Sequence, residues 1–158
     1  MRIDPVAALL LALPLAAALA CGGEKTTIET DEGTVTVDRD DQTVTFSAGD
    51  EIIEMKTGER VELPKDFPKD VPVYPSATIL TSMTSPEGIM VASRSTADAA
   101  EVVAFYKKTL VGEGWTVEGE MNMGPQHIIS FAKGDRQVTV TAASDEGETQ
   151  ISLMAAGG

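Results

Sequence analysis

The chain has 158 residues with 12 basic and 25 acidic side chains, which gives a formal net charge of −13. Because so acidic a surface repels phosphate groups, the composition argues against nucleic-acid binding and against electrostatic adhesion to anionic lipids. The apolar share of 42% is typical of a globular chain of one domain or two small ones, and it argues against disorder throughout.

Residues 1–20 have the organisation of a secretory signal peptide. Arg2 supplies the positive start, an apolar run covers 6–20, and Ala-Leu-Ala at 18–20 is a small-residue cleavage site. The run is short for a membrane span of about 20 residues, and Pro14 interrupts it. We therefore expect cleavage after residue 20 rather than a retained membrane anchor.

Cys21 follows this cleavage site and is the only cysteine of the chain. The sequence Ala18-Leu19-Ala20-Cys21 resembles the lipobox of bacterial lipoproteins, although leucine is commoner at the position of Ala18. The resemblance implies that the Cys21 thiol receives a diacylglyceryl group and that its new amino group is acylated, with palmitate as a typical chain. Two or more acyl chains anchor a protein stably, because each buried CH₂ contributes about 0.8 kcal/mol. The alternative is a secreted protein with a free thiol.

Residues 21–25 would then be a lipidated cysteine and a short linker that keeps the folded part close to the membrane. Gly22 stands where many lipoproteins retained in the inner membrane carry aspartate. The resemblance therefore favours the periplasmic face of the outer membrane as the location.

Residues 26–63 predict a small β-hairpin region. Threonine and apolar residues alternate over 33–38 and over 42–47, with an aspartate-rich turn between them. Two further short strands are expected over 52–55 and 60–63.

Residues 64–76 contain prolines spaced four, four and three residues apart. Proline fixes φ and removes a backbone donor, so we predict an extended, polyproline-like strap. Phe67, Val71, Val73 and Tyr74 give the strap an apolar side, which favours packing against its own domain over presentation to a partner.

Residues 77–158 predict a domain with several strands and one helix. The helix follows a possible cap at Ser95 or Thr96 and stops at Gly112, and its apolar face should cross an antiparallel sheet with Tyr106 and Trp115 in the core. The expected strands cover 77–84, 88–95, 115–118, 126–133, 136–142 and 149–154. The predicted fold class is thus α+β: an antiparallel sheet packed by one helix, preceded by the β-hairpin region and the strap.

A second resemblance covers about residues 60 to 155. Val71-Pro72-Val73-Tyr74-Pro75 in the strap, Phe105-Tyr106-Lys107 in the helix and Gly114-Trp115 after it are similar to motifs of a group of small bacterial envelope proteins. That group implies no known activity, so the resemblance bears on the fold rather than on the function.

The sequence offers little for catalysis. His127 is the one histidine, there is no Gly-x-Ser-x-Gly motif, and a lipidated Cys21 would leave no free thiol. His127 shares strand parity with Ile129 and Phe131, which is typical of a structural histidine at a strand end. An acidic surface supplies carboxylate pairs by chance, so we expect no catalytic residues, no cofactor and no enzymatic activity.

Two clusters could bind metal. Asp38, Asp40 and Asp41 lack the spacing of a calcium loop, so a solvated turn is the better interpretation. The thioethers of Met121 and Met123, with the imidazole of His127, would suit Cu(I) in an exported protein, although core packing explains methionines equally well.

The leading hypothesis is therefore a non-catalytic, lipid-anchored envelope protein that binds another envelope component or supports an assembly. The alternative from a different class is a periplasmic soft-metal or small-ligand binding protein that uses Met121, Met123 and His127. A third hypothesis is a hydrolase built on surface carboxylates.

Overall fold

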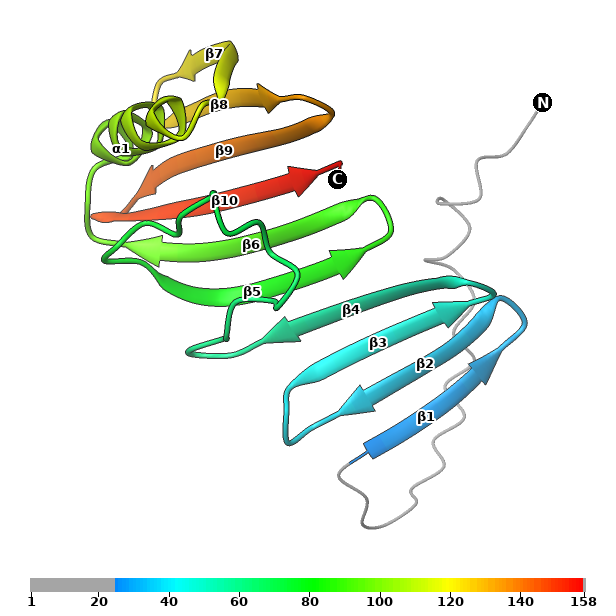
Figure 1. Ribbon diagram of the computed structural model, residues 1–158. Coiled ribbons are helices and arrows are strands. Elements are labelled where there is room, and N and C mark those ends of the chain that lie inside the picture. Colours follow the sequence, from blue (N-terminus) through cyan, green and yellow to red (C-terminus); the bar gives the residue numbers. More distant parts are fainter. Residues whose placement is uncertain (1–24, 158) are drawn as a thin grey trace, which may run out of the picture.

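Strands account for most of the described chain, which is residues 25–157 of the computed structural model (Figure 1). They form one antiparallel sheet in the order β1-β2-β3-β4-β5-β6-β10-β9-β8-β7. One helix, α1 (Ala99–Gly112), separates β6 from β7. The strands are β1 (Lys25–Thr30), β2 (Gly33–Asp38), β3 (Thr43–Ala48), β4 (Glu51–Thr57), β5 (Thr78–Ser85), β6 (Gly88–Ser95), β7 (Thr116–Met123), β8 (Gln126–Lys133), β9 (Arg136–Asp145) and β10 (Glu148–Ala156).

The predicted α+β class is wrong, because strands hold 57% and the helix 11% of the described residues. Among the strands, the helix packs mainly against β7, β8 and β9, at one end of the sheet. In the middle of the sheet β4 pairs with β5, from Glu54 opposite Thr84 to Thr57 opposite Thr81. The hairpin strands therefore extend the same sheet, and the fold is mostly β.

Two local predictions also need correction. Residues 60–63 form no strand, although the Val61 amide donates to the Ile79 carbonyl at 2.9 Å. The strand β1, in contrast, was not expected. The predicted strands over 33–38 and 126–133 are confirmed, since β2 and β8 have these bounds.

The hydrophobic core lies on one face of the sheet, which we call the covered face. Four core side chains stand opposite one another across β8, β9, β10 and β6, as the strand registers show. They are Ile129, Val140, Leu153 and Val91, and none is accessible to water. Tyr106 of α1 and Trp115 join this core, as predicted, with 0% and 3% of their surface exposed.

The helix begins at Ala99, three residues after Thr96 and four after Ser95, the two expected caps. Asp98 holds the N-cap position without a side-chain hydrogen bond. The first helical amide, of Ala99, instead donates to the Ser144 hydroxyl at 3.3 Å. Ser95 caps a local turn, because its hydroxyl accepts the Ala97 amide at 3.2 Å.

The strap over 64–76 is a chain of reverse turns rather than an extended polyproline segment. The amides of Phe67 and Val71 donate to the carbonyls three residues earlier, at 3.0 and 3.1 Å. A proline φ near −65° suits such turns as well as it suits polyproline II, so proline spacing alone could not distinguish them. The predicted packing is confirmed, since only 4% of Phe67 and 3% of Val71 are exposed within the core cluster.

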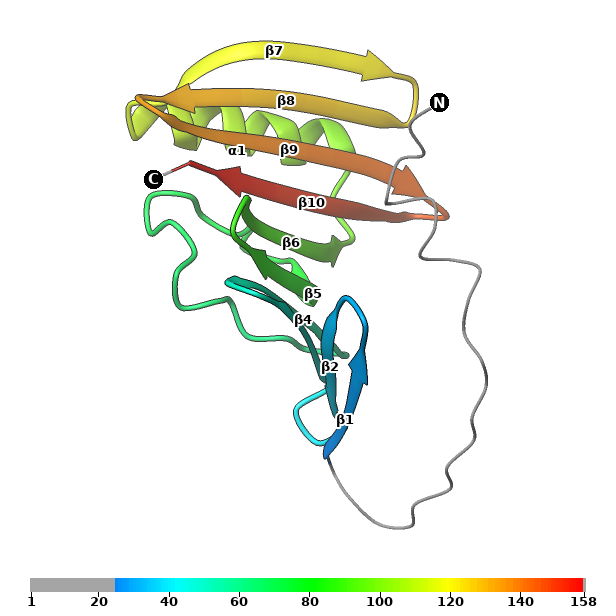
Figure 2. The ribbon, with the colours of Figure 1, turned by 90° about the vertical axis from the view of Figure 1, so that its right-hand side faces the viewer.

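The opposite face of the sheet, the open face, is covered by neither α1 nor the strap. Figure 2 shows α1 on one side of β7, β8 and β9 only. Strands β1 to β4 contain no buried residue, so this end of the sheet has no core of its own among the described residues. No helix within residues 25–157 is long and apolar enough to cross a membrane.

Candidate binding face

Four methionines stand directly opposite one another on four neighbouring strands. Met55 of β4 pairs with Met83 of β5, Met83 pairs with Met90 of β6, and Met90 pairs with Met154 of β10. Directly opposed residues of an antiparallel sheet project to the same side. We call Met55, Met83, Met90 and Met154 the methionine row.

Strand alternation places the methionine row on the open face. Met154 stands between Leu153 and Ala155, which are both buried in the core. Because successive side chains of a strand point to opposite faces, Met154 must point away from the core. Its exposed fraction of 48% agrees with this position.

The same face carries the other two methionines of the described residues. Met121 pairs with Ile128, which pairs with Thr141 of β9, and Met123 pairs with Gln126. Met121 and Met123 are 56% and 49% exposed. Methionine is unbranched and polarisable, and surfaces rich in it adapt to differently shaped apolar partners.

Apolar side chains continue from the methionine row across β1 to β4. Two rows of directly opposed residues carry them on the open face. The rows are Ile28, Val35, Phe46 and Ile53, and Val37, Val44 and Met55. Together with the methionine row they form an apolar band over seven strands, which spans roughly 30 Å at the usual strand spacing.

The apolar band contains no charged residue, although the chain has a net charge of −13. On the covered side of the same strands, Lys56 stands opposite Thr43 and Glu54 opposite Thr45. Charged side chains reach the open face near strand ends, where Arg94 and Glu148 form an exposed ion pair at 3.4 Å. The charge distribution thus leaves the middle of the open face free for uncharged contacts.

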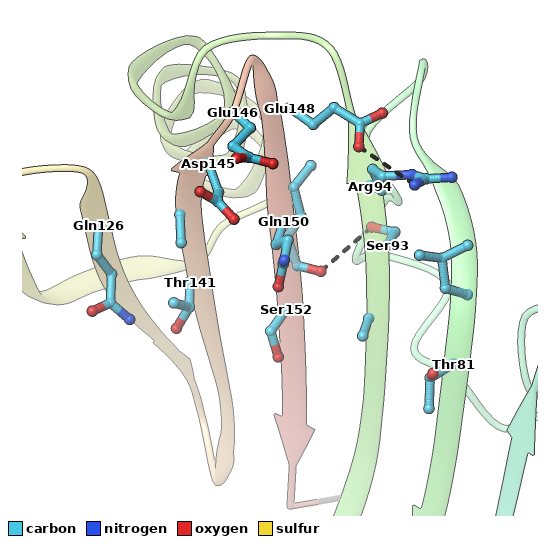
Figure 3. A pocket seen from close by; sticks show the side chains of 14 residues that line it. Thr81, Ser93, Arg94, Gln126, Thr141, Asp145, Glu146, Glu148, Gln150 and Ser152 are labelled. Carbon is cyan, nitrogen blue, oxygen red and sulfur yellow. Dashed lines mark hydrogen bonds and ion pairs between the residues drawn. The ribbon is translucent and has the colours of Figure 1, made fainter.

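A hollow of about 510 Å³ lies on the open face beside the methionine row. Figure 3 shows Gln126, Thr141, Gln150 and Ser152, which project from β8, β9 and β10 along it. Thr81 and Arg94 add to its lining on β5 and β6, and the carboxylates of Asp145, Glu146 and Glu148 line its end at the β9–β10 turn. Amides and hydroxyls both donate and accept hydrogen bonds, so the hollow can satisfy uncharged polar groups of a bound molecule.

The structure does not bring the proposed copper ligands together. His127 pairs with Asn122 of β7 and Ala142 of β9, so it projects to the covered face. Met121 and Met123 flank Asn122 and project to the open face. The imidazole and the two thioethers therefore lie on opposite sides of the sheet, and the expected parity of His127 with Ile129 is confirmed.

The remaining candidate residues either stabilise a turn or lie outside the residues that the structure describes. The Asp38 carboxylate accepts the amides of Asp40 at 3.1 Å and Asp41 at 3.3 Å, which closes the predicted turn. Among residues 25–157, no three His, Cys, Asp or Glu side chains are placed to hold a metal ion. Cys21, the predicted lipidation site, lies outside the described residues.

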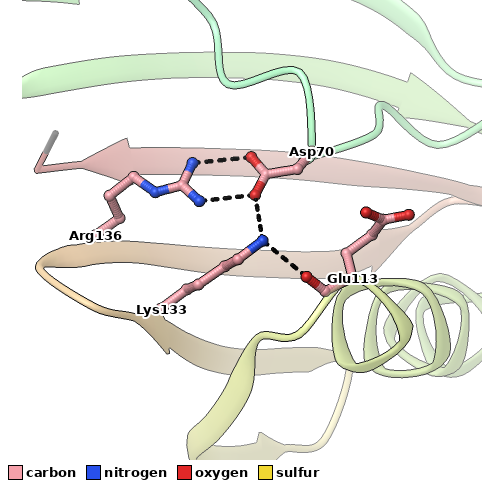
Figure 4. A network of polar contacts seen from close by, with 4 residues as sticks. All are labelled: Asp70, Glu113, Lys133 and Arg136. Carbon is pink, nitrogen blue, oxygen red and sulfur yellow. Dashed lines mark hydrogen bonds and ion pairs between the residues drawn. The ribbon is translucent and has the colours of Figure 1, made fainter.

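An ion-pair cluster fastens the strap over the covered face (Figure 4). Both oxygens of Asp70 accept hydrogen bonds from the Arg136 guanidinium, at 2.9 and 2.7 Å. Lys133 bonds to the same carboxylate at 2.9 Å and to the Glu113 carbonyl at 2.7 Å. The Arg136 guanidinium also lies 4.8 Å from the centre of the Trp115 ring. The cluster therefore ties the strap, the β8–β9 hairpin and the end of α1 together.

The protonation of this cluster follows from the same contacts. The hydrogen bonds from Arg136 hold the pKa of the Asp70 carboxyl far below its ordinary value, despite partial burial. The carboxylate raises the pKa of Arg136 in return. Asp70 therefore stays ionised in the folded protein, and the cluster holds the strap in place rather than transferring protons.

Sequence reasoning missed the open face, although the sequence contained a signal for it. Met90 stands between Ile89 and Val91 within an expected strand. A methionine flanked by two core residues belongs to the opposite face. Alignment of the methionines with one another could not be foreseen, because strand order and register decide it.

Comparisons with known proteins give one similarity. A family model described as START domain-like matches residues 76–149, just under half of the chain. The matched segment includes β5 to β9 and α1, and thereby most of the lining of the hollow. No curated protein and no solved structure matches the chain significantly.

Proposed function

We propose that the protein is an exported envelope protein, anchored through lipid on Cys21, that binds a protein partner through the open face and has no catalytic activity. The observation that carries this proposal is the apolar band that no described element covers. Soluble proteins rarely expose contiguous apolar patches larger than a few hundred Å², and larger patches mark interaction sites. The anchor is supported by the resemblance of residues 18–21 to a lipobox.

The chemistry of the open face defines the partner. The band lacks charges and is rich in methionine, so it fits an apolar surface of variable shape. The hollow adds the amides and hydroxyls of Gln126, Thr141, Gln150 and Ser152 at one side of the band, with its charged residues gathered at the end near the β9–β10 turn. A partner with an apolar patch flanked by backbone or amide groups would match both regions.

The family comparison supports a binding role. START-like domains generally bind ligands, and the matched residues 76–149 include most of the lining of the hollow. The band extends beyond that segment into β1 to β4. A surface roughly 30 Å long exceeds most small ligands, which favours a protein as the occupant.

A charge placed in the band should abolish partner binding. Met154 is 48% exposed, so Met154→Glu should fold normally while it introduces an unpaired carboxylate into the interface. We expect the variant to recover at least tenfold less partner than the native chain after cross-linking in intact cells and affinity purification. Mass spectrometry of the co-purified proteins provides the measurement.

Val111→Glu is the matched control, because Val111 is 51% exposed but lies on α1, which packs against the covered face. This variant should recover the native amount of partner. Cys21→Ser should release the chain from the membrane fraction, whereas Met154→Glu should leave it there. Equal recovery with both glutamate variants would contradict the proposal, and a co-purified small molecule in place of a protein would assign a ligand to the hollow instead.

A further inference from the structure

We propose that the outer edge of β1 pairs with the same edge of a second copy, so that two sheets join into one continuous antiparallel sheet. β1 ends the sheet, and no described residue pairs with its outer side (Figure 1). An unpaired strand edge presents a row of free amide and carbonyl groups, which is a template for another strand.

The two edge strands of the sheet, β1 and β7, differ in how readily they can pair with a further strand. β7, at the opposite edge, is irregular between Val117 and Gly119, where a bulge includes Glu118. Bulges, glycine and charges are the usual means by which proteins block edge pairing. β1 pairs with β2 through all six of its residues without a bulge and contains neither proline nor glycine, and its two charged residues, Lys25 and Glu29, are of opposite sign. The edge that accepts a strand is therefore β1.

The turn after β1 determines which backbone groups point outward. Two residues connect Thr30 to its partner Gly33, so that pair is hydrogen-bonded and the pairs alternate from there along the hairpin. Every second residue of β1 thus directs its amide and carbonyl away from β2. These outward-facing residues are Lys25, Thr27 and Glu29.

The outward-facing residues are complementary to themselves in one register. When Thr27 faces Thr27 of the second copy, Lys25 of each copy faces Glu29 of the other. All three outward-facing residues then form backbone pairs, and two pairs of opposite charge stand directly across the junction, where such pairs stabilise a sheet. The arrangement has the two-fold symmetry that is commonest in homodimers.

The same register also extends the open face. Ile28, which is 53% exposed, would lie opposite Thr26 of the second copy. The apolar bands of the two copies would then meet at the junction. Pairing through β1 leaves the methionine row uncovered. Dimer formation is therefore independent of partner binding at the methionine row.

Disulfide trapping tests the register. In the exported chain with Cys21→Ser, Thr27→Cys becomes the only thiol and faces its own copy at a Cα separation of about 5.5 Å, which a disulfide can bridge. Glu29→Cys and Lys25→Cys are the controls, because each would lie about 14 Å from its counterpart, too far for a disulfide. We expect the disulfide-linked dimer to form at least tenfold faster with Thr27→Cys. Similar rates at the three positions would overturn the proposal.

Charge reversal tests the complementarity. Glu29→Lys would place lysines opposite one another, and it should raise the dimer dissociation constant at least tenfold in analytical ultracentrifugation. The double variant Lys25→Glu, Glu29→Lys restores opposite charges and should recover the native constant. Both side chains are exposed, so neither change threatens the fold. A native chain that stays monomeric at high concentration, or a double variant no better than the single one, would refute the pairing.

Discussion

Phe67→Ala is expected to lower the free energy of unfolding by about 3–4 kcal/mol, the usual cost of emptying a buried phenylalanine site. Phe67 is 4% exposed and is the largest buried side chain of the strap. Its loss removes apolar area and leaves a cavity beneath a segment without regular secondary structure. Urea unfolding followed by Trp115 fluorescence measures the change, since Trp115 belongs to the same core.

Phe46→Ala provides the matched control for this prediction. The same atoms are deleted, but Phe46 lies on the open face and is only half-buried. We expect a loss of about 1 kcal/mol there, because water already reaches the ring and no closed cavity forms. Equal losses for the two variants would mean that the strap is not part of the core.

Asp70→Asn is expected to destabilise the protein by about 1–2 kcal/mol at pH 7. The substitution keeps the size of the side chain but removes the charge that holds Arg136 and Lys133. The side chain is 22% exposed, so solvent screening keeps the effect below that of a fully buried pair. Asp66→Asn, an exposed change in the same strap, should cost less than about 0.5 kcal/mol.

The pH dependence of this effect has a defined sign. Because the folded pKa of Asp70 lies below the value of the unfolded chain, ionised Asp70 stabilises the fold most fully above about pH 5. The stabilisation is lost as the pH falls below about 4, where the unfolded carboxyl takes up a proton and the folded one does not. The stability difference between the native chain and Asp70→Asn should therefore shrink from pH 5 to pH 2. A difference that stays constant over this range would exclude the ionised cluster as its cause.

The sequence predicted local structure better than it predicted the architecture. Alternation of threonine and apolar residues located β2 and β3, and helical periodicity located α1. The pairing of β4 with β5 has no local signal, because the turns of the strap separate the two strands in the chain. The predicted α+β class is wrong for that reason. The sequence indicated a separate hairpin region, whereas β1 to β4 are four further strands of the same sheet.

The candidate site shows the same division between local and long-range information. Strand parity alone places Met90 and Met154 opposite the core, and it also separates His127 from Met121. Alignment of Met55 with Met154 through two intervening strands requires the register of the whole sheet. Side-chain type and spacing predicted a copper site with Met121 and Met123 on β7. The strand register instead aligns four other methionines in the methionine row, on β4, β5, β6 and β10.

Site-specific photo-cross-linking tests the role of the open face most directly. A photoreactive amino acid is placed at Met154 in one chain and at Val111 in another, two positions of similar exposure on different surfaces. After irradiation of intact cells, we expect a single protein cross-linked at Met154 and none at Val111. Cross-linking at Val111 with nothing at Met154 would contradict the assignment of the open face as the binding surface.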